Sequence, residues 1–344
     1  MHSNTVNVST GPVQISKQVQ QAFAATPISH RSIEFKKLYN NTARFLCAQL
    51  KVQKTYFITG SGTAANEAMI WQIKLSGGNG LILSNGEFGQ RLIEQATRAS
   101  LKFIDHKLLW GAAFDLQLIE IEIRKHNINW VLFCHCETST GVLNDFDSIS
   151  QVCARNNCLC FVDCMSTIGT YPLDLSGIAM ATASSGKGLA SIPGLAIIFS
   201  NIETISSNQI PVYFDLGIYD KKEGIPFTLS SNLLYALHIS TRKKLQNKQL
   251  SLIDQYSEDC FQLLNENNLL PFNKAGSKVF TVAQPNMAIT NFIADLRREK
   301  IVVSSESAYL KERNWFQIAF FGYYEDVELD TVLNTLQRTI SKFN

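Results

Sequence analysis

Two residues near the middle of the sequence have types and positions that suit covalent chemistry on a bound small molecule. Asp163 directly follows the apolar run 159–162, and Lys187 lies 24 residues later, in a stretch of Ser and Gly residues that precedes another apolar run. A carboxylate at the C-terminal end of a strand lies where open α/β sheets bind ligands. A lysine packed in a turn of small residues can be desolvated, which makes its amine a nucleophile. The pair therefore indicates one site in which an acid and an amine act on the same ligand.

Pyridoxal 5'-phosphate (PLP) is a cofactor that needs both groups. Its aldehyde forms a Schiff base with a lysine amine, and an acid facing the pyridine nitrogen keeps the ring protonated and thus a better electron sink. Taken singly, the residues have ordinary explanations: a strand-end Asp that caps the next turn, and a solvated Lys on a glycine-rich loop. Together they predict a PLP site with Lys187 and Asp163 as its catalytic residues.

A third segment, Gly60-Ser61-Gly62-Thr63-Ala64-Ala65-Asn66-Glu67-Ala68, has the composition of an anion-binding turn. It follows the apolar run 56–58 and opens a predicted helix, whose free N–H groups can bind a phosphate together with the Ser and Thr hydroxyls. The segment also matches the loose pattern GxGxxG/A, which raises a nicotinamide-dependent dehydrogenase as an alternative. That pattern expects an acidic residue after the next strand, whereas the run 81–83 is followed by Ser84 and Asn85. A phosphate cradle is therefore the better interpretation.

Alternating apolar runs and helical stretches must position these residues. After an N-terminal arm and a predicted helix at 32–50, the apolar runs lie at 56–58, 81–83, 101–104, 130–133, 159–162 and 195–199. Stretches with helical periodicity separate several of them, for example at 64–73 and 146–156. This alternation predicts a mostly parallel sheet with helices on both faces.

The pattern changes after residue 229. It predicts a long helix at 231–267, then a strand at 279–282, a helix at 287–299, strands at 301–303 and 315–319, and a closing helix at 326–343. We therefore expect an N-terminal arm (residues 1–25), a large domain (26–240) and a small C-terminal domain (241–344), with the arm packing on the small domain.

Composition limits the classes of partner. The 344 residues are 45% hydrophobic and 17% charged, which predicts a globular chain with a sizeable core. Lys and Arg exceed Asp and Glu by 31 − 29 = 2, and the basic clusters are small, so nucleic acid and anionic membranes are not expected partners. No apolar run approaches the roughly 18 residues of a membrane span, and a cytoplasmic location is expected. The sequence contains eight cysteines, but neither CxxC nor HExxH spacing occurs in it. We therefore expect buried thiols and no metal site.

Seven segments in the expected order resemble the signatures of class V PLP-dependent aminotransferases, and the resemblance extends from residue 10 to about residue 325. They are Thr10-Gly11-Pro12, Ser29-His30-Arg31-Ser32-Ile33-Glu34-Phe35, Gly60-Ser61-Gly62-Thr63, Asn85-Gly86-Glu87-Phe88-Gly89-Gln90-Arg91, His135-Cys136-Glu137-Thr138-Ser139-Thr140-Gly141-Val142-Leu143-Asn144, Val162-Asp163-Cys164-Met165-Ser166 and Ser185-Gly186-Lys187. Within the class, the fifth and sixth segments are most similar to the 2-aminoethylphosphonate:pyruvate aminotransferases, and alanine:glyoxylate aminotransferases are more distant.

The resemblance implies an α/β fold of the aspartate aminotransferase-like PLP fold type I, with a mostly parallel seven-stranded sheet in the large domain and an α+β small domain. It implies that Lys187 forms the Schiff base and that Asp163 pairs with the pyridine nitrogen. It also implies a homodimer in which the neighbouring subunit contributes Thr228 to the phosphate. The further cofactor contacts implied are Ser61, Gly62 and Thr63 at the phosphate, Phe88 stacked on the ring, Thr138 at the 3-oxygen, and Met165; the substrate contacts are Gly11, Arg31 and Gln317.

Two positions depart from the family pattern. The family usually has Gln or Asn before the Schiff-base lysine, where this chain has Gly186. The family's Phe-Arg-Ile-Gly motif reads Phe316-Gln317-Ile318-Ala319, so the Arg that would bind the substrate's carboxylate or phosphonate is replaced by a neutral amide. Arg313 is a candidate substitute if the strand extends to it, because residues four apart share a strand face. Arg31 and Arg91 are other candidate anion contacts.

These observations predict an aminotransferase with a small-molecule amine donor, 2-aminoethylphosphonate-like by resemblance, and a 2-oxo acid acceptor such as pyruvate or glyoxylate. The absence of Arg at position 317 makes a less anionic primary amine or an unusual amino acid comparable candidates. One alternative is a class V lyase, such as a desulfurase, which needs a Cys on a mobile loop. Another is a relative that binds a ligand without turnover.

Overall fold

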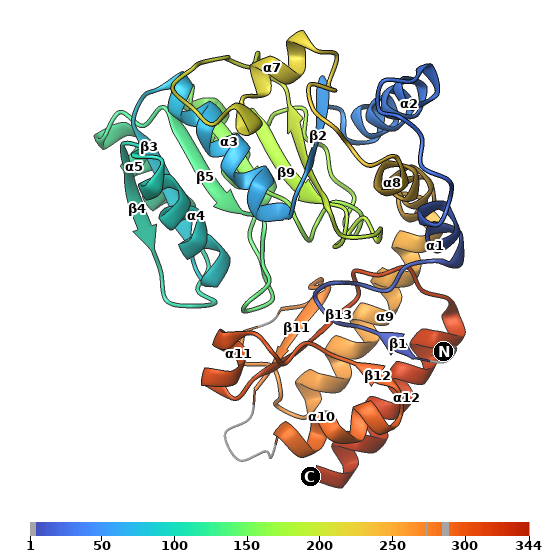
Figure 1. Ribbon diagram of the computed structural model, residues 1–344. Helices are drawn as coiled ribbons and strands as arrows, with labels where there is room; N and C mark the ends of the chain where they lie inside the picture. The colour runs from blue at the N-terminus through green and yellow to red at the C-terminus, as the bar shows by residue number, and fades with distance from the viewer. Residues whose placement is uncertain (1–4, 273, 284–288, 344) are drawn as a thin grey trace.

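The computed structural model describes residues 5–272, 274–283 and 289–343. Figure 1 shows a larger unit built around one sheet and a smaller unit that contains both ends of the described chain. The strands of the large sheet are β2 (Lys54–Thr59), β3 (Gly80–Ser84), β4 (Phe103–Lys107), β5 (Trp130–Cys134), β8 (Leu159–Asp163), β9 (Met180–Ser184) and β10 (Leu195–Ser200). Their order is β2-β10-β9-β8-β5-β3-β4, and β10 alone runs antiparallel to its neighbours. The predicted α/β fold with a mostly parallel seven-stranded sheet is confirmed.

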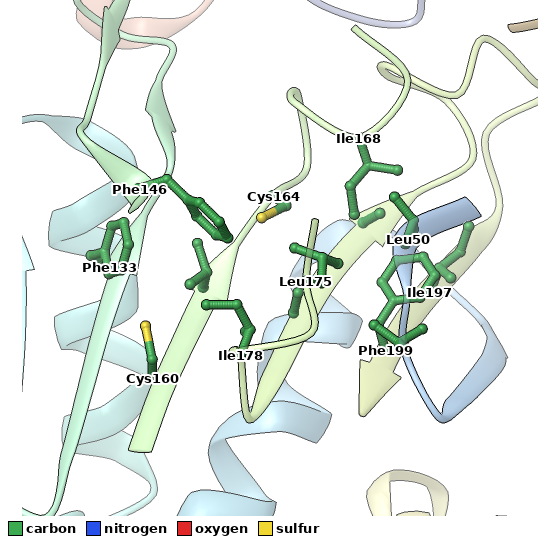
Figure 2. Packing of buried hydrophobic residues seen from close by; sticks show 14 of the residues in the cluster. Leu50, Phe133, Phe146, Cys160, Cys164, Ile168, Leu175, Ile178, Ile197 and Phe199 are labelled. Carbon is green, nitrogen blue, oxygen red and sulfur yellow. The ribbon is translucent and has the colours of Figure 1, made fainter. Parts of the chain in front are cut away.

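Helices cover both faces of this sheet because neighbouring residues of a strand point to opposite sides. In β8, Cys160 and Val162 pack in a cluster with helix residues such as Ile149, whereas Phe161 packs on the other face with residues such as Met69. Figure 2 shows part of the first cluster, including Phe133, Phe146 and Cys160. The helices of the larger unit are α2 (Ile33–Leu50), α3 (Gly62–Ser76), α4 (Glu87–Arg98), α5 (Leu116–Lys125), α6 (Phe146–Arg155), α7 (Leu216–Lys221) and α8 (Ser231–Lys244), with a short 3-10 helix η1 (Val212–Phe214).

The smaller unit has its own apolar core, in which Phe280, Phe316 and Leu336 pack together. Its elements are α9 (Asn247–Glu266), β11 (Val279–Val282), α10 (Ile289–Arg298), β12 (Ile301–Val302), α11 (Ala308–Arg313), β13 (Phe316–Ala319) and α12 (Asp326–Phe343). The antiparallel pair β11–β13 lies on the side that faces the large sheet in Figure 1.

The N-terminal segment joins the smaller unit. Strand β1 (Val6–Asn7) pairs in parallel with β12, and Val6 and Val8 belong to the core of that unit. Helix α1 (Lys17–Phe23) then packs against α8. The boundaries expected at residues 25 and 240 stay a prediction.

Three local expectations differ from the structure. The helix predicted over 231–267 is two helices, because Leu245 and Gln246 leave the helical path and Gln246 takes an extended conformation at the start of α9. The strand predicted at 101–104 begins at Phe103 and continues to Lys107, as β4. The segment before β13 is the helix α11, which the pattern did not indicate, and residues 287 and 288 of the predicted helix 287–299 lie outside the described residues.

A short two-stranded pair completes the elements near the site. Strands β6 (Cys136–Glu137) and β7 (Val142–Leu143) are antiparallel and enclose the loop 138–141. Across the described ranges, no helix is both long enough and apolar enough to cross a membrane.

Candidate active site

Asp163 is the last residue of β8 and is held in one orientation by two donors. The Met165 backbone N–H donates to Oδ1 at 2.9 Å, and Asn66 Nδ2 donates to Oδ2 at 2.7 Å. The Thr182 hydroxyl donates to Asn66 Oδ1 at 2.6 Å, which fixes the orientation of that amide. Burial raises the pKa of Asp163, while the two hydrogen bonds and the positive charge of Lys187 act in the opposite direction. The result is a buried, oriented carboxyl group at the end of the sheet where ligands bind.

Lys187 lies on the turn that follows β9, the strand next to β8. The turn is braced by the Ser185 backbone, whose N–H donates to Leu195 O at 3.0 Å. A Cβ on Gly188 would collide with the Ile168 carbonyl, so glycine lets this turn approach the loop after Asp163 closely. Lys187 Nζ lies 5.0 Å from the centroid of the Phe88 ring. The amine therefore faces the same space as the aromatic ring and the carboxyl group.

That space is a cavity of about 550 Å³. Most of the side chains predicted to bind the cofactor line it, from elements that are far apart in sequence. The predicted residues lining the cavity are Ser61, Gly62, Thr63, Phe88, Thr138, Asp163, Met165 and Lys187.

The N-terminus of α3 forms one end of the cavity. Ser61 occupies the position before the helix, and its side chain makes no capping hydrogen bond to the helix N–H groups. Its hydroxyl, that of Thr63 and the first-turn N–H groups are thus available to an anion, which the positive end of the helix dipole favours. A Cβ at Gly62 would overlap Met165 Sδ, so this close packing requires glycine. The arrangement suits a phosphate group.

Glu137 fixes the helix that carries Phe88. The residue before α4, Gly86, has no side chain for capping, and the buried Glu137 carboxyl accepts from the N–H groups of Phe88 at 3.1 Å and Gly89 at 2.9 Å. Burial raises the pKa of Glu137, and these hydrogen bonds oppose that rise. Glu137 thus connects the position of Phe88 to the loop that begins at Thr138.

Four predicted contacts do not line this cavity. Gly11 packs against Lys187, since a Cβ on it would lie 3.6 Å from Lys187 Cγ. Gln317 is buried next to Thr138. Arg31 and Thr228 are exposed. The structure brings Gly11 and Gln317 to the edges of the site and leaves Arg31 and Thr228 outside it.

The structure shows what surrounds Gly186 and where the arginines near Gln317 and the cavity lie. A Cβ on Gly186 would lie 2.7 Å from Pro193 Cγ, so the Pro193 ring occupies the space of a larger side chain. The expectation that Arg313 could extend the strand face of Gln317 is wrong, because Arg313 belongs to α11 and lies outside β13. Its guanidinium stacks on Trp110, 4.0 Å from a ring centroid. Arg91 does line the cavity and stacks on Phe88 at 5.0 Å.

Sequence reasoning did not single out several residues of the site. Asn66 lies inside the glycine-rich segment, one helical turn after Gly62, and its spacing on α3 could have marked it as facing the cavity. Ser184 lies three residues before Lys187, and Ser166 three after Asp163; both line the cavity. Cys134 and Cys136 line it too, and burial raises the pKa of Cys136 to about 12.

Within the described ranges, no group of His, Cys, Asp and Glu residues has an arrangement that could hold a metal ion.

Comparisons with known proteins agree with this geometry. The family model described as "Aminotransferase class-V" matches residues 13–210. A protein of Anabaena cylindrica named "Soluble hydrogenase 42 kDa subunit" is 32% identical over 66% of this chain and 63% of its own length. A 2-aminoethylphosphonate--pyruvate transaminase of Pseudomonas putida is 31% identical over 60% of each chain. The chain thus spans less than two thirds of the length of these relatives.

A solved structure shows the same fold over the whole chain. The aspartate aminotransferase of subgroup IV from Thermus thermophilus superimposes with a TM-score of 0.89 over 98% of this chain and 100% of that one, at 21% identity. At this identity the likeness concerns the fold, which is PLP fold type I. The residues of the cavity fit the family's cofactor, because they offer an amine, a buried acid, an aromatic face and an anion-binding helix end. On the family model and the fold, the chain belongs to the class V aminotransferases.

Proposed function

We propose that this protein is a PLP-dependent aminotransferase that moves an amino group from a primary amine or amino acid to a 2-oxo acid such as pyruvate or glyoxylate. The observation that carries the proposal is the single cavity that contains Lys187, Asp163 and Phe88 at one end and the uncapped N-terminus of α3 at the other. The similarity to the Pseudomonas putida transaminase makes 2-aminoethylphosphonate one donor to test.

Each residue has a distinct task in this proposal. When bound, PLP supplies an aldehyde that accepts the amino group and a ring that withdraws electrons from the carbon beside the nitrogen. Asp163, held by Asn66, keeps a proton on the ring nitrogen. The Lys187 amine would bind the cofactor's aldehyde, and as a free amine it would move the proton of the donor carbon that bears the nitrogen. Phe88 covers one face of the ring and limits its movement.

Other residues bind the ends of the cofactor. Ser61, Thr63 and the first N–H groups of α3 bind the phosphate, and Met165 packs against Gly62 beneath it. Thr138 lines the same cavity, and its hydroxyl would bind the 3-oxygen. Ser184 is a further candidate phosphate contact, since it lines the cavity and precedes Lys187 on the same strand end.

The substrate's acidic group needs a cation, and Arg91 is the best placed. Among the described residues that line the cavity, the cations besides Lys187 are Arg91 and Arg98. Arg91 Cζ and Lys187 Nζ each lie 5.0 Å from the Phe88 centroid, so they are at most about 10 Å apart. The Arg91 guanidinium pairs with Glu87 at 2.9 Å, so the acidic group of a substrate would bind to an arginine that Glu87 already orients. The predicted substrate contacts of Gly11 and Arg31 remain part of the proposal.

The thiols give no support to a desulfurase-type lyase. All eight cysteines are free, seven are buried and Cys47 is partly buried. Burial raises the pKa of Cys136, which lines the cavity, so its reactive thiolate form is disfavoured. We therefore propose transamination in preference to a lyase reaction. The presence of both Lys187 and Asp163 favours an enzyme over a protein that binds a ligand without turnover.

We further propose a homodimer in which each subunit contributes Thr228 to the phosphate site of the other. Thr228 is exposed on the loop between α7 and α8 and does not belong to the cavity of its own chain. An exposed hydroxyl in this position suits a contact made across a two-fold axis. A cytoplasmic location is part of the same prediction.

The test is the visible absorbance of the purified protein loaded with PLP. We expect the band to shift on addition of a productive donor from a panel of 2-aminoethylphosphonate, L-alanine, L-aspartate and simple amines, and to return with pyruvate or glyoxylate. Lys187→Ala should lower turnover on the order of 10²- to 10⁴-fold, the usual contribution of a positioned acid–base group. A band that no donor shifts, or full turnover by Lys187→Ala, would refute the proposal.

A further inference from the structure

Gln317 occupies the position at which the family pattern has a substrate-binding Arg, yet its side chain is closed off from the cavity. Its exposed fraction is 0%, and it is not among the residues that line the cavity. Nε2 donates to the Thr138 carbonyl and, at 2.9 Å, to Thr281 Oγ1. Oε1 accepts from the Tyr309 hydroxyl at 3.0 Å. Both ends of the amide are therefore engaged by protein groups.

The partners of Gln317 belong to a larger set of contacts between the smaller unit and the loop 138–141. Thr281 lies directly opposite Gln317 in the β11–β13 pair, and its hydroxyl donates to Ser139 O at 3.1 Å. The Ser277 hydroxyl donates to Gly141 O at 2.7 Å. Three side chains of the smaller unit thus donate to three carbonyls of one loop of the larger unit, and we call this set the loop latch (Ser277, Thr281 and Gln317).

The latched loop is the one that faces the cofactor site. Thr138 lines the cavity, and Glu137 immediately before it accepts the N–H groups that place Phe88. Movement of the loop would therefore displace the Thr138 hydroxyl and loosen the start of α4.

An arginine would not reproduce the contacts of glutamine in this latch. A guanidinium has only donors, so it could not accept the hydrogen bond that the Tyr309 hydroxyl donates to Gln317 Oε1. A buried charge there would also lack a carboxylate partner among the contacts described, which makes it costly. The contacts present therefore suit a neutral group that both donates and accepts.

We propose that Gln317 is a positioning residue that, with Thr281, holds Thr138 at the cofactor site, and that it does not bind the carboxylate of the substrate. The effect on the cofactor rests on the proposed function; the effect on the loop does not. It follows for the substrate that its acidic group is recognised elsewhere in the cavity, and that position 317 does not discriminate between amines with and without a carboxylate.

The first test measures backbone hydrogen exchange of the full-length protein without cofactor. Gln317→Met and Thr281→Val remove latch hydrogen bonds, and Thr335→Val is the matched control, a buried threonine on α12 of the same unit. A typical hydrogen bond contributes about 1 kcal/mol, so we expect amides in 138–142 to exchange about 2- to 10-fold faster in both latch variants and at the wild-type rate in Thr335→Val. Unchanged exchange in Gln317→Met and Thr281→Val would overturn the latch.

The second test uses the protein loaded with PLP. If the latch places Thr138, the pH midpoint of the cofactor's visible absorbance change shifts in Gln317→Met and Thr281→Val and stays constant in Thr335→Val. Faster exchange with an unmoved midpoint would mean that Gln317 has only a structural role, and it would overturn the positioning claim.

A third measurement compares half-reaction rates with L-alanine and ethylamine, which differ by a carboxylate. The ratio of the two rates should be the same in Gln317→Met as in the wild type. A drop of about 10-fold or more for L-alanine alone would identify Gln317 as a substrate ligand.

The two proposals fail separately. A protein that does not bind PLP would refute the proposed function, while the exchange measurement would still decide the latch. Should Gln317→Met not fold, Tyr309→Phe removes only the hydroxyl that donates to Oε1, and it should give the same change in exchange with a smaller amplitude.

Discussion

Asn66 Nδ2 lies 2.7 Å from Asp163 Oδ2, so a residue of α3 holds the carboxyl group at the end of β8. This hydrogen bond favours the ionised form of Asp163 against the effect of burial. Asn66→Ala should therefore raise the pKa of Asp163 further. The acid limb of the pH profile of kcat/KM should move to higher pH, and activity at neutral pH should fall about 10-fold, as expected for a hydrogen bond to a charged group.

The control for this change is Gln72→Ala. Gln72 is also a buried amide on α3, but it bonds to the backbone of Ile205 outside the cavity. It should lower the free energy of unfolding without moving the acid limb. If Asn66→Ala leaves the pH profile where it is, Asn66 does not tune Asp163.

Removal of the Glu137 carboxyl should loosen the helix that carries Phe88. Glu137→Ala leaves the N–H groups of Phe88 and Gly89 without their acceptor, and the loss of such a cap should lower the free energy of unfolding by about 2 to 4 kcal/mol. Urea unfolding of the protein without cofactor measures this change, and a PLP titration should show weaker binding. Glu312→Ala, at an exposed position on α11, should change neither quantity.

Restoring the family residue at position 186 should harm this protein. A side chain there would meet the Pro193 ring, so Gly186→Asn should cost about 1 to 3 kcal/mol through overpacking. Gly186→Asn combined with Pro193→Ala should recover part of the loss, which thermal unfolding of the single and double variants would detect. Additive losses in the double variant would show that the two positions are not coupled.

Mixed subunits test the shared phosphate site. In a dimer of one Lys187→Ala chain and one Thr228→Ala chain, a single site has both Lys187 and the partner's Thr228. We expect the mixed dimer to recover about half the wild-type activity per dimer at a PLP concentration that leaves the Thr228→Ala homodimer mostly unloaded. Recovery no greater than the sum of the two homodimers would place Thr228 within its own subunit or outside the site.

Lys244 should make stability depend on pH. Its side chain is completely buried at the end of α8, its Nζ donates to Gly322 O, and burial lowers its pKa well below the ordinary value. Between the lowered pKa and about 10.4, the unfolded chain binds more protons than the folded one, so the free energy of unfolding rises with pH in that window. Its slope from this group is up to about 1.4 kcal/mol per pH unit.

Lys244→Met should remove this contribution. Urea unfolding at several pH values between 6 and 9 would show a flatter dependence in the variant than in the wild type. The neighbouring Lys243→Met, at a position that is only partly buried, should keep the wild-type slope. An equal slope in Lys244→Met and wild type would mean that Lys244 is charged in the folded protein.

Much of the large sheet could be predicted because its signals are local. Apolar runs of the right length become strands, so Asp163 was expected at the C-terminal end of the strand that is β8, where ligands bind. Strand β9, which precedes Lys187, was not among the predicted strands, and Lys187 was placed in the same site because an amine and an acid suit one ligand. The glycine-rich segment before α3 carried its own signal in the same way. Helix boundaries such as the break at Leu245 and Gln246 could not be predicted, because neither residue is a helix breaker and the turn depends on where the next helix must pack.

What the sequence by itself determined is therefore the fold class, the family and the amine–acid pair, since each depends on residue types at short spacing. Only the tertiary structure decided which groups Gln317 and Arg313 contact. Gln317 meets Thr138 across 179 positions of the chain, and Arg313 turns away onto Trp110 because a short helix precedes β13. Contacts between residues so far apart in sequence depend on how the smaller and the larger unit pack against each other. No local pattern of residues predicts that packing.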